Sequence, residues 1–210
     1  MISANRPGAI DTVIFDLGNV LINWDPRHLY RKLFGQDVEG MERFLADVCP
    51  PHWNEQQDAG RTWEEGIKQA VALHPEQEML IRAYRERWDE MLGGVISESV
   101  AVLDQLRKGD IRLFALTNWS HETFPMALQR YEFLSWFRGI LVSGQERLIK
   151  PDPAIFRLLL SRFDIDAARA VFIDDNIRNV EGARHVGLHA LHFTDAQRMR
   201  LDLRALGLPV

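Results

Sequence analysis

Residues Thr12 to Leu21 read TVIFDLGNVL, and this stretch decides how the rest of the chain is interpreted. The β-branched and aromatic run from Val13 to Phe15 predicts a short buried strand. Asp16 follows this run directly, and Gly18 allows the backbone to turn just after it. A carboxylate at the carboxyl end of a buried strand lies where open α/β sheets bind their ligands. The stretch therefore predicts the first strand of an α/β domain and the beginning of its active site.

From Val95 onward the pattern alternates between helix and strand. Apolar runs predict strands over residues 111–116, 139–142, 170–173 and 190–193. Helical patterns lie over residues 99–107, from Ser120, after Asp152-Pro153, from Asp175 to Val186, and after a capping pair formed by Thr194 and Gln197. Alternating βα units with continuous apolar strands predict a Rossmann-like parallel sheet covered by helices on both faces.

From Asp25 to about Gly94 the pattern is different and predicts helices and no strand. Asp25 before Pro26 is a favourable helix start, and Thr62 with Glu65 forms a capping box. The polar residues 52–61 predict a loop. Four amphipathic helices in succession predict a small bundle. We therefore expect an α/β core of residues 1–21 and 95–210, with a helical domain of residues 22–94 inserted after the first strand.

The composition narrows the function classes. In 210 residues, a net charge of −5 without a lysine–arginine run argues against nucleic-acid binding. No apolar stretch is long enough to span a bilayer, so we expect no membrane partner. Cys49 is the one cysteine, and the amino terminus lacks the apolar core of a signal peptide, which favours a cytoplasmic location. The sequence does not indicate an oligomeric state.

Polar side chains follow three of the predicted strands at the points where they end. They are Asp16, the pair Thr117-Asn118 and the pair Asp174-Asp175, and Lys150 lies in a loop before a helix. The carboxyl ends of parallel strands meet at one edge of a sheet, so these groups are expected to converge. Three carboxylates, a lysine and a hydroxyl–amide pair suit phosphoryl transfer, with one carboxylate as nucleophile and the others near a divalent cation such as Mg²⁺.

Each position also has a simpler explanation. Asp16 alone could cap a turn, Lys150 could be an ordinary solvated residue, and the hydroxyl–amide pair could cap a helix. Asp174 and Asp175 are harder to explain as structural residues, because adjacent acids repel each other and only one of them can cap a helix. Taken together in this order, the four positions favour an active site.

The order resembles that of the haloacid dehalogenase superfamily of aspartate-nucleophile hydrolases. The resemblance covers essentially the whole chain and is carried by FDLGNV (15–20), LTN (116–118), KPDPAIF (150–156) and FIDDN (172–176). It implies that Asp16 is a nucleophile whose aspartyl-phosphate is hydrolysed by water, and that the helical insertion is a cap of the superfamily's first type.

The resemblance also implies roles for the other site residues. Mg²⁺ would be held by the Asp16 carboxylate, the Gly18 carbonyl and the Asp174-Asp175 pair, of which Asp175 is the expected ligand and Asp174 an open alternative. The phosphoryl oxygens of a small phosphoester would be bound by a further set, which consists of Thr117, Asn118 and Lys150.

The sequence departs from the superfamily at Gly18, where most of its phosphatases carry a second aspartate that protonates the leaving group. General acid catalysis typically contributes about 10²–10⁴-fold. One interpretation is a phosphatase whose substrate has a good leaving group, or whose acid is water or a cap residue. The form DLGNV resembles a bacterial branch that includes an α-glucose 1-phosphate phosphatase, and this favours a sugar phosphate.

Two other interpretations stay open. A 2-haloacid dehalogenase would use Asp16 as nucleophile without a metal and without an acid at position 18. A protein with a degraded site would only bind a phosphoester. The Asp174-Asp175 pair favours the phosphatase, because dehalogenases resembling this chain usually carry serines there and have no metal to bind.

Two tryptophans lie beside the proposed catalytic residues, Trp24 after the nucleophile loop and Trp119 directly after Asn118. Aromatic walls suit a sugar face or a small organic acid, although core packing is the commoner role of a tryptophan. Residues 22–25 and 93–96 join the expected cap to the core. We expect them to act as hinges when the cap opens and closes over the substrate.

Overall fold

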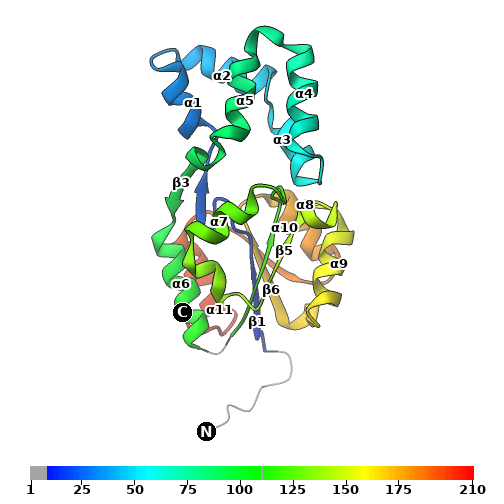
Figure 1. Ribbon diagram of the computed structural model, residues 1–210. Helices are drawn as coiled ribbons and strands as arrows, with labels where there is room; N and C mark the ends of the chain where they lie inside the picture. Colours follow the sequence, from blue (N-terminus) through cyan, green and yellow to red (C-terminus); the bar gives the residue numbers. More distant parts are fainter. Residues whose placement is uncertain (1–8, 110) are drawn as a thin grey trace.

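The computed structural model describes residues 9–109 and 111–210. Its centre is a five-stranded sheet with the order β5-β4-β1-β6-β7 (Figure 1). The strands are β1 (Thr12–Phe15), β4 (Arg112–Thr117), β5 (Gly139–Val142), β6 (Ala170–Asp174) and β7 (His189–His192). All neighbouring pairs are parallel, and β1 lies in the middle between β4 and β6. The predicted α/β fold with a parallel sheet is confirmed.

Helices cover both faces of this sheet. Successive residues of a strand point to opposite sides, so each face carries apolar side chains that the helices bury. Val13 and Phe15 belong to one hydrophobic cluster, whereas Ile14 belongs to the other. The first cluster includes residues of α6 (Ser97–Lys108), α7 (Phe124–Arg130) and α11 (Ala196–Ala205). The second includes residues of α9 (Pro153–Arg162) and α10 (Ile177–His185). Burial on both faces explains why the strands read as continuous apolar runs.

Short helical turns complete this part of the chain. A four-residue helix, α8 (Ser143–Glu146), follows β5 directly. The 3₁₀ turns η3 (Glu132–Trp136) and η4 (Ala167–Arg169) precede β5 and β6. Pro125 lies in the first turn of α7, where its missing N–H costs nothing, so it starts this helix rather than breaking it.

Between β1 and α6 the chain forms a helical layer that lies beyond the carboxyl edge of the sheet (Figure 1). Its elements are α1 (Arg27–Phe34), α2 (Val38–Asp47), α3 (Pro51–Asp58), α4 (Trp63–Leu73), η1 (Pro75–Gln77), α5 (Glu78–Glu86) and η2 (Trp88–Met91). Aromatic rings fill its interior, with centroids 4.8 Å apart for Tyr30 and Phe44 and 5.5 Å apart for Trp63 and Tyr84. The expected helical insertion is present, and its assignment as a separate cap domain stays a prediction.

The prediction that no strand lies between Asp25 and about Gly94 is wrong at the end of this segment. The two segments that join the helical layer to the core form β2 (Ile22–Trp24) and β3 (Leu92–Val95), which pair antiparallel. Strands this short show no clear alternation of apolar and polar residues, and Gly93 and Gly94 have no side chains that could contribute to such a pattern. The two connections are therefore tied to each other rather than being independent loops.

The prediction of a loop over residues 52–61 is also wrong, because α3 occupies most of it. The helix begins at Pro51, which is suited to a first turn, and buries Trp53 and Gln57. Its few apolar residues give no helical periodicity, which explains why the sequence showed four helices here instead of five.

The helix caps were predicted with mixed success. The capping box of Thr62 and Glu65 is present at α4. Asp25 accepts a hydrogen bond from the Arg27 amide at 2.8 Å, but α1 begins one residue after Pro26. The box expected at Thr194 is wrong, because Asp195 caps α11 by accepting from the Arg198 amide at 2.8 Å.

Among the residues that the structure describes, no helix has both the length and the hydropathy that crossing a membrane requires. The start of the chain, for which we expect no signal peptide, lies largely outside the described residues.

Candidate active site

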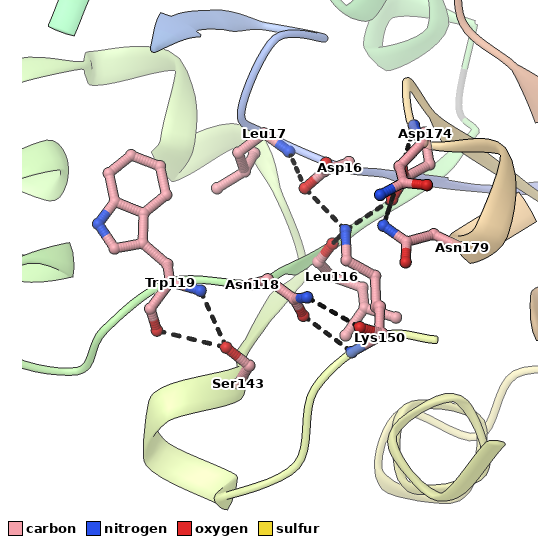
Figure 2. A network of polar contacts seen from close by, with 10 residues as sticks. Asp16, Leu17, Leu116, Asn118, Trp119, Ser143, Lys150, Asp174 and Asn179 are labelled. Atoms are coloured by element: carbon pink, nitrogen blue, oxygen red, sulfur yellow. Dashed lines mark hydrogen bonds and ion pairs between the residues drawn. The ribbon is translucent and has the colours of Figure 1, made fainter. Parts of the chain in front are cut away.

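The polar groups expected at the strand ends do come together at the carboxyl edge of the sheet (Figure 2). Asp16 follows the central strand β1, and its amide donates to the Ile173 carbonyl at 2.8 Å. Asp174 is the last residue of β6, beside β1. Lys150 lies in the loop between α8 and α9. The parallel sheet thus unites groups that are more than 100 residues apart in sequence.

Lys150 is the centre of this arrangement. Its ammonium group donates to Asp16 Oδ1 at 2.9 Å, to Asp174 Oδ2 at 2.6 Å and to the Leu116 carbonyl at 3.1 Å (Figure 2). An ammonium has three N–H donors, so these acceptors use all of them. Burial lowers the pKa of Lys150, but the attraction of Asp16 and Asp174 outweighs it and raises the pKa above its usual value. Lys150, with 3% of the residue exposed, is therefore a fixed buried cation.

Asp16 is also buried, with 7% of its surface exposed. Its Oδ1 accepts from the Leu17 amide at 2.7 Å as well as from Lys150. Both bonds are made to Oδ1, so Oδ2 is the oxygen suited to attack an electrophile or to bind a cation. Burial raises the pKa of Asp16 to about 7, Lys150 lowers it, and the nearby Asp174 and Asp175 raise it further. A cation at this site would favour the ionised, nucleophilic form.

Oxygens of Asp16, Asp174 and Asp175 lie within 4.8 Å of one another. The Asp174 carboxylate is completely buried and accepts from Lys150, from the Asn176 amide at 2.8 Å and from Asn179 Nδ2 at 3.0 and 3.1 Å. Asp175 is exposed instead. Burial and the charge of Asp174 raise the pKa of Asp175. The two adjacent acids thus differ, since Asp174 is held by hydrogen bonds within the protein whereas Asp175 is exposed.

This donor set fits a hard divalent cation. Mg²⁺ binds carboxylate and carbonyl oxygens and commonly uses one or two carboxylates together with substrate phosphate. Asp16, Gly18 and Asp175 line the same cavity, so two carboxylates and the backbone of Gly18 surround one space. A cation there would also offset the crowding of three acids against one lysine.

Asn118 and Thr117 occupy different surroundings. Asn118 Nδ2 donates to the Lys150 carbonyl at 3.0 Å, and the Lys150 amide donates back to Asn118 Oδ1 at 2.9 Å (Figure 2). The amide therefore holds the backbone of the lysine loop. Thr117 is 1% exposed and is not among the residues that line the cavity, whereas Asn118 and Lys150 are. Direct phosphate contact by these three residues stays a prediction.

A cavity of about 620 Å³ lies between the sheet edge and the helical layer. The core side contributes the carboxylates and Lys150, and the helical side contributes residues of α2, α3 and α5. Arg27 lies at its wall, in an ion pair with Glu42 at 2.6 Å. A volume of this size is typical of a small-molecule site.

A second, smaller pocket of about 70 Å³ adjoins the first and shares most of its lining. Its walls are Gly18, Trp24, Asn54, Asp58, Trp88, Asn118 and Trp119. Both tryptophans predicted to lie beside the site are therefore at this pocket, and Trp119 also packs on Trp88 with ring centroids 5.3 Å apart. The sequence reasoning missed Asp58, because it lies in α3, where a polar loop was expected.

Residues 10–187 match the family model described as haloacid dehalogenase-like hydrolase. Among curated proteins, the drimenol cyclase drtB of Aspergillus calidoustus is 28% identical over 200 residues, which is 92% of this chain and 36% of the relative. The sesquiterpene phosphatase astK of Aspergillus oryzae is 30% identical over 106 residues, which is 50% of this chain and 54% of the relative. The chain thus spans between about a third and a half of the length of these two proteins.

Solved structures share the fold. A HAD family enzyme of Bacteroides thetaiotaomicron, in complex with magnesium and inorganic phosphate, aligns with a TM-score of 0.66 and 23% identity over 89% of this chain and 96% of its own. The L-2-haloacid dehalogenase RSc1362 aligns with a TM-score of 0.68 and 20% identity over 93% and 99%. A phosphate-binding and a dehalogenating protein match equally well, so the fold alone does not separate the two chemistries.

Proposed function

The chain belongs to the haloacid dehalogenase-like hydrolases, and on this premise we propose that it is a Mg²⁺-dependent phosphatase acting on a small phosphate monoester. The observation that carries the proposal is that the two adjacent acids, Asp174 and Asp175, have different surroundings. Asp174 is committed to Lys150 and Asn179, while exposed Asp175 faces the cavity near Asp16. A third acid beside the nucleophile has a use only if a cation is bound.

In the proposed reaction, Asp16 Oδ2 attacks the phosphorus and the bond to the leaving oxygen breaks. Water then hydrolyses the aspartyl-phosphate and regenerates the carboxylate. Lys150 holds Asp16 in place and offsets its charge, and Asn118 fixes the lysine loop. A bound Mg²⁺, held by Asp16, Asp175 and the Gly18 carbonyl, would offset the negative charge of the phosphoryl group. Phosphatases among the relatives, including astK, support this assignment.

The same contacts weigh against a dehalogenase. A 2-haloacid carries a carboxylate of its own, and without a metal it would meet three acids around one lysine whose donors are already used. Like charges this close are mutually unfavourable. The lack of an acid at Gly18 is the feature that a dehalogenase would share, so this reaction is the alternative that the experiment must exclude.

The substrate class follows from the cavity. Its volume of about 620 Å³ accommodates a phosphorylated metabolite larger than phosphate itself, and Trp24 and Tyr84 are aromatic residues of its lining. A sugar phosphate with an anomeric leaving group fits the absence of an acid at Gly18. The two relatives named for terpenoid compounds suggest that prenyl and terpenyl phosphates should be included among the candidate substrates.

A phosphate-release assay tests the proposal. α-Glucose 1-phosphate, prenyl phosphates and 4-nitrophenyl phosphate are incubated with Mg²⁺ or with EDTA. We expect metal-dependent release that Asp16→Asn abolishes, with a loss of at least about 10³-fold because the nucleophile is removed. Metal-independent halide release from 2-chloropropionate, without turnover of any phosphoester, would replace the phosphatase by a dehalogenase. Phosphoester binding without either reaction would show a binding protein.

A further inference from the structure

Asp58 is a carboxyl group at the active site that the reaction described so far does not use. It is the last residue of α3, in the helical layer, and it lines both the large cavity and the small pocket. Gly18 lines the same small pocket from the core side. Asp58 therefore faces the position at which this sequence lacks an acid.

The position of Asp58 is fixed from two sides. Asn54, one turn earlier on α3, donates from Nδ2 to Asp58 Oδ2 at 3.0 Å. The Ser143 hydroxyl donates to the Asp58 backbone carbonyl at 2.6 Å and also accepts from the Trp119 amide at 2.9 Å. The end of α3 is thus bonded to the same core segment that forms the pocket wall, so the carboxyl is held against the site.

The walls of the small pocket carry unpaired polar atoms. Trp24 Nε1, Asn54 Oδ1 and Trp119 Nε1 are buried and have no hydrogen-bond partner within the described part of the chain. Leaving such an atom buried without a partner is unfavourable. Three of them around one pocket, two donors and one acceptor, indicate a space suited to a polar group of a ligand, such as the hydroxyl-bearing end of an alcohol.

The protonation of Asp58 suits an acid. Burial raises its pKa to about 7, against the lowering effect of a hydrogen bond from the Ser120 amide and of the Lys150 charge, and Glu55 on the same helix raises it further. A large share of the molecules therefore carries the proton at neutral pH. An acid with a pKa near the working pH is the efficient one.

We propose that Asp58, supplied by the helical layer, protonates the leaving oxygen of the phosphoester in place of the acid missing at Gly18. The inference rests on the proposed phosphatase activity. As the bond from Asp16 to phosphorus forms, the phosphorus–oxygen bond breaks, its electron pair stays on the leaving oxygen, and the Asp58 proton passes to that oxygen to give a neutral alcohol. The Asp58 carboxylate then takes a proton from the water that hydrolyses the aspartyl-phosphate, which restores both groups.

The dependence of kcat/KM on the leaving group tests this assignment. A series of phosphomonoesters from 4-nitrophenyl phosphate, whose anion leaves readily, to alkyl phosphates is compared for the wild type, Asp58→Asn and the control Glu64→Gln. Asp58→Asn should lose about 10²–10³-fold with the alkyl esters and less than about tenfold with the nitrophenyl ester. Glu64 is exposed on α4, in the same helical layer, and lines neither the cavity nor the small pocket, so its variant should keep the wild-type slope.

The pH profile is a second readout. Because only protonated Asp58 donates, the raised pKa keeps the acid active up to about pH 7, and kcat/KM for alkyl esters should fall above it. Asp58→Asn should remove this basic limb. Equal losses of Asp58→Asn over the whole ester series, with the limb unchanged, would mean that Asp58 only supports the structure and would overturn the assignment.

A rescue variant separates chemistry from folding. A Cβ at Gly18 meets nothing within 4 Å, so the first side-chain atom of Gly18→Asp has room. Added to Asp58→Asn, it should restore alkyl-ester turnover at least tenfold, because it places an acid at the same pocket. A wild type that releases phosphate but is unaffected by Asp58→Asn would refute this inference alone. A wild type that hydrolyses no phosphoester would instead refute the proposed function.

Discussion

Asp16, Lys150 and Asp174 form a buried charge network in which one ammonium serves two carboxylates. The partners are almost fully enclosed, with 1% of the lysine side chain, 11% of the Asp16 side chain and none of the Asp174 side chain exposed. Desolvating such a network costs several kcal/mol per ion, and its attractions repay this cost only while every member is present. The network therefore ties the proposed active site and the stability of the fold to the same residue, Lys150.

Lys150→Met should lower the free energy of unfolding by about 3–5 kcal/mol, because it leaves two buried acids without their cation. Urea denaturation in EDTA measures the change. Lys32→Met is a matched control, since Lys32 pairs with Glu90 at 2.8 Å with 55% of its side chain exposed, and such pairs contribute about 0–1 kcal/mol. Equal effects of the two substitutions would contradict the buried-network interpretation.

The convergence of the candidate site residues could be predicted from the sequence, but their contacts could not. Asp16, Asn118 and Asp174 could be placed together because parallel strands end at one edge. That Asn118 binds the Lys150 backbone, and that Asp174 is the enclosed member of its pair, depends on side-chain packing between distant segments. Asp58 could not be found, because a single acid in a polar stretch carries no pattern.

At the level of elements, the strongest departures from expectation are at the two connections. β2 and β3 pair over Ile22–Val95 and Asn23–Gly94, with an irregularity after Asn23. The pairing joins both connections into one ribbon, which couples the entry and the exit of the helical layer. Gly94 adopts a left-handed backbone, with φ at 109°, which few other residues tolerate. A motion of the helical layer would thus bend this ribbon as a unit.

We expect the ribbon to report on closure of the helical layer. Hydrogen–deuterium exchange is compared for the free protein and for the protein with Mg²⁺ and a phosphate analogue. Both strands should gain protection together when the site is filled, because cap closure orders the connections that carry it. Unchanged exchange in β2 and β3, alongside protection at the site loops, would show that they are not hinges.

The element-level pattern also shows where sequence signals are sufficient. The capping box at Thr62 has a chemical signature that is independent of the rest of the fold, and it is present. Helix α3 begins without a side-chain cap at Pro50 and has a polar composition, so tertiary packing, such as that of Trp53 against Trp63 and Tyr84, contributes to its stability. Tertiary packing of this kind is not visible in a local pattern.

For the whole molecule, the arrangement concentrates negative charge where the core and the helical layer meet. Asp16, Asp174 and Asp175 approach one another within 4.8 Å, and the cavity above them also presents Asp58 and Glu55. A protein that keeps such a cluster in the absence of a ligand does so at a cost in stability. Binding of a cation and of a phosphate should recover that stability, since only the folded state offers the site.

Asp175→Asn tests this trade-off. In EDTA we expect the variant to unfold at a higher temperature than the wild type by roughly 2–4 °C, which corresponds to about 1 kcal/mol of relieved repulsion in a protein of this size. Mg²⁺ with phosphate should raise the wild-type melting temperature by several degrees, as ligand at about 100 times its Kd adds about 2.7 kcal/mol. The same ligands should leave the melting temperature of Asp175→Asn nearly unchanged, because a cation ligand is lost.

The control is Glu181→Gln, which changes an exposed acid on α10 and should behave like the wild type. A variant that is less stable in EDTA, yet is still stabilised by Mg²⁺, would show that Asp175 supports the fold and does not bind the ion.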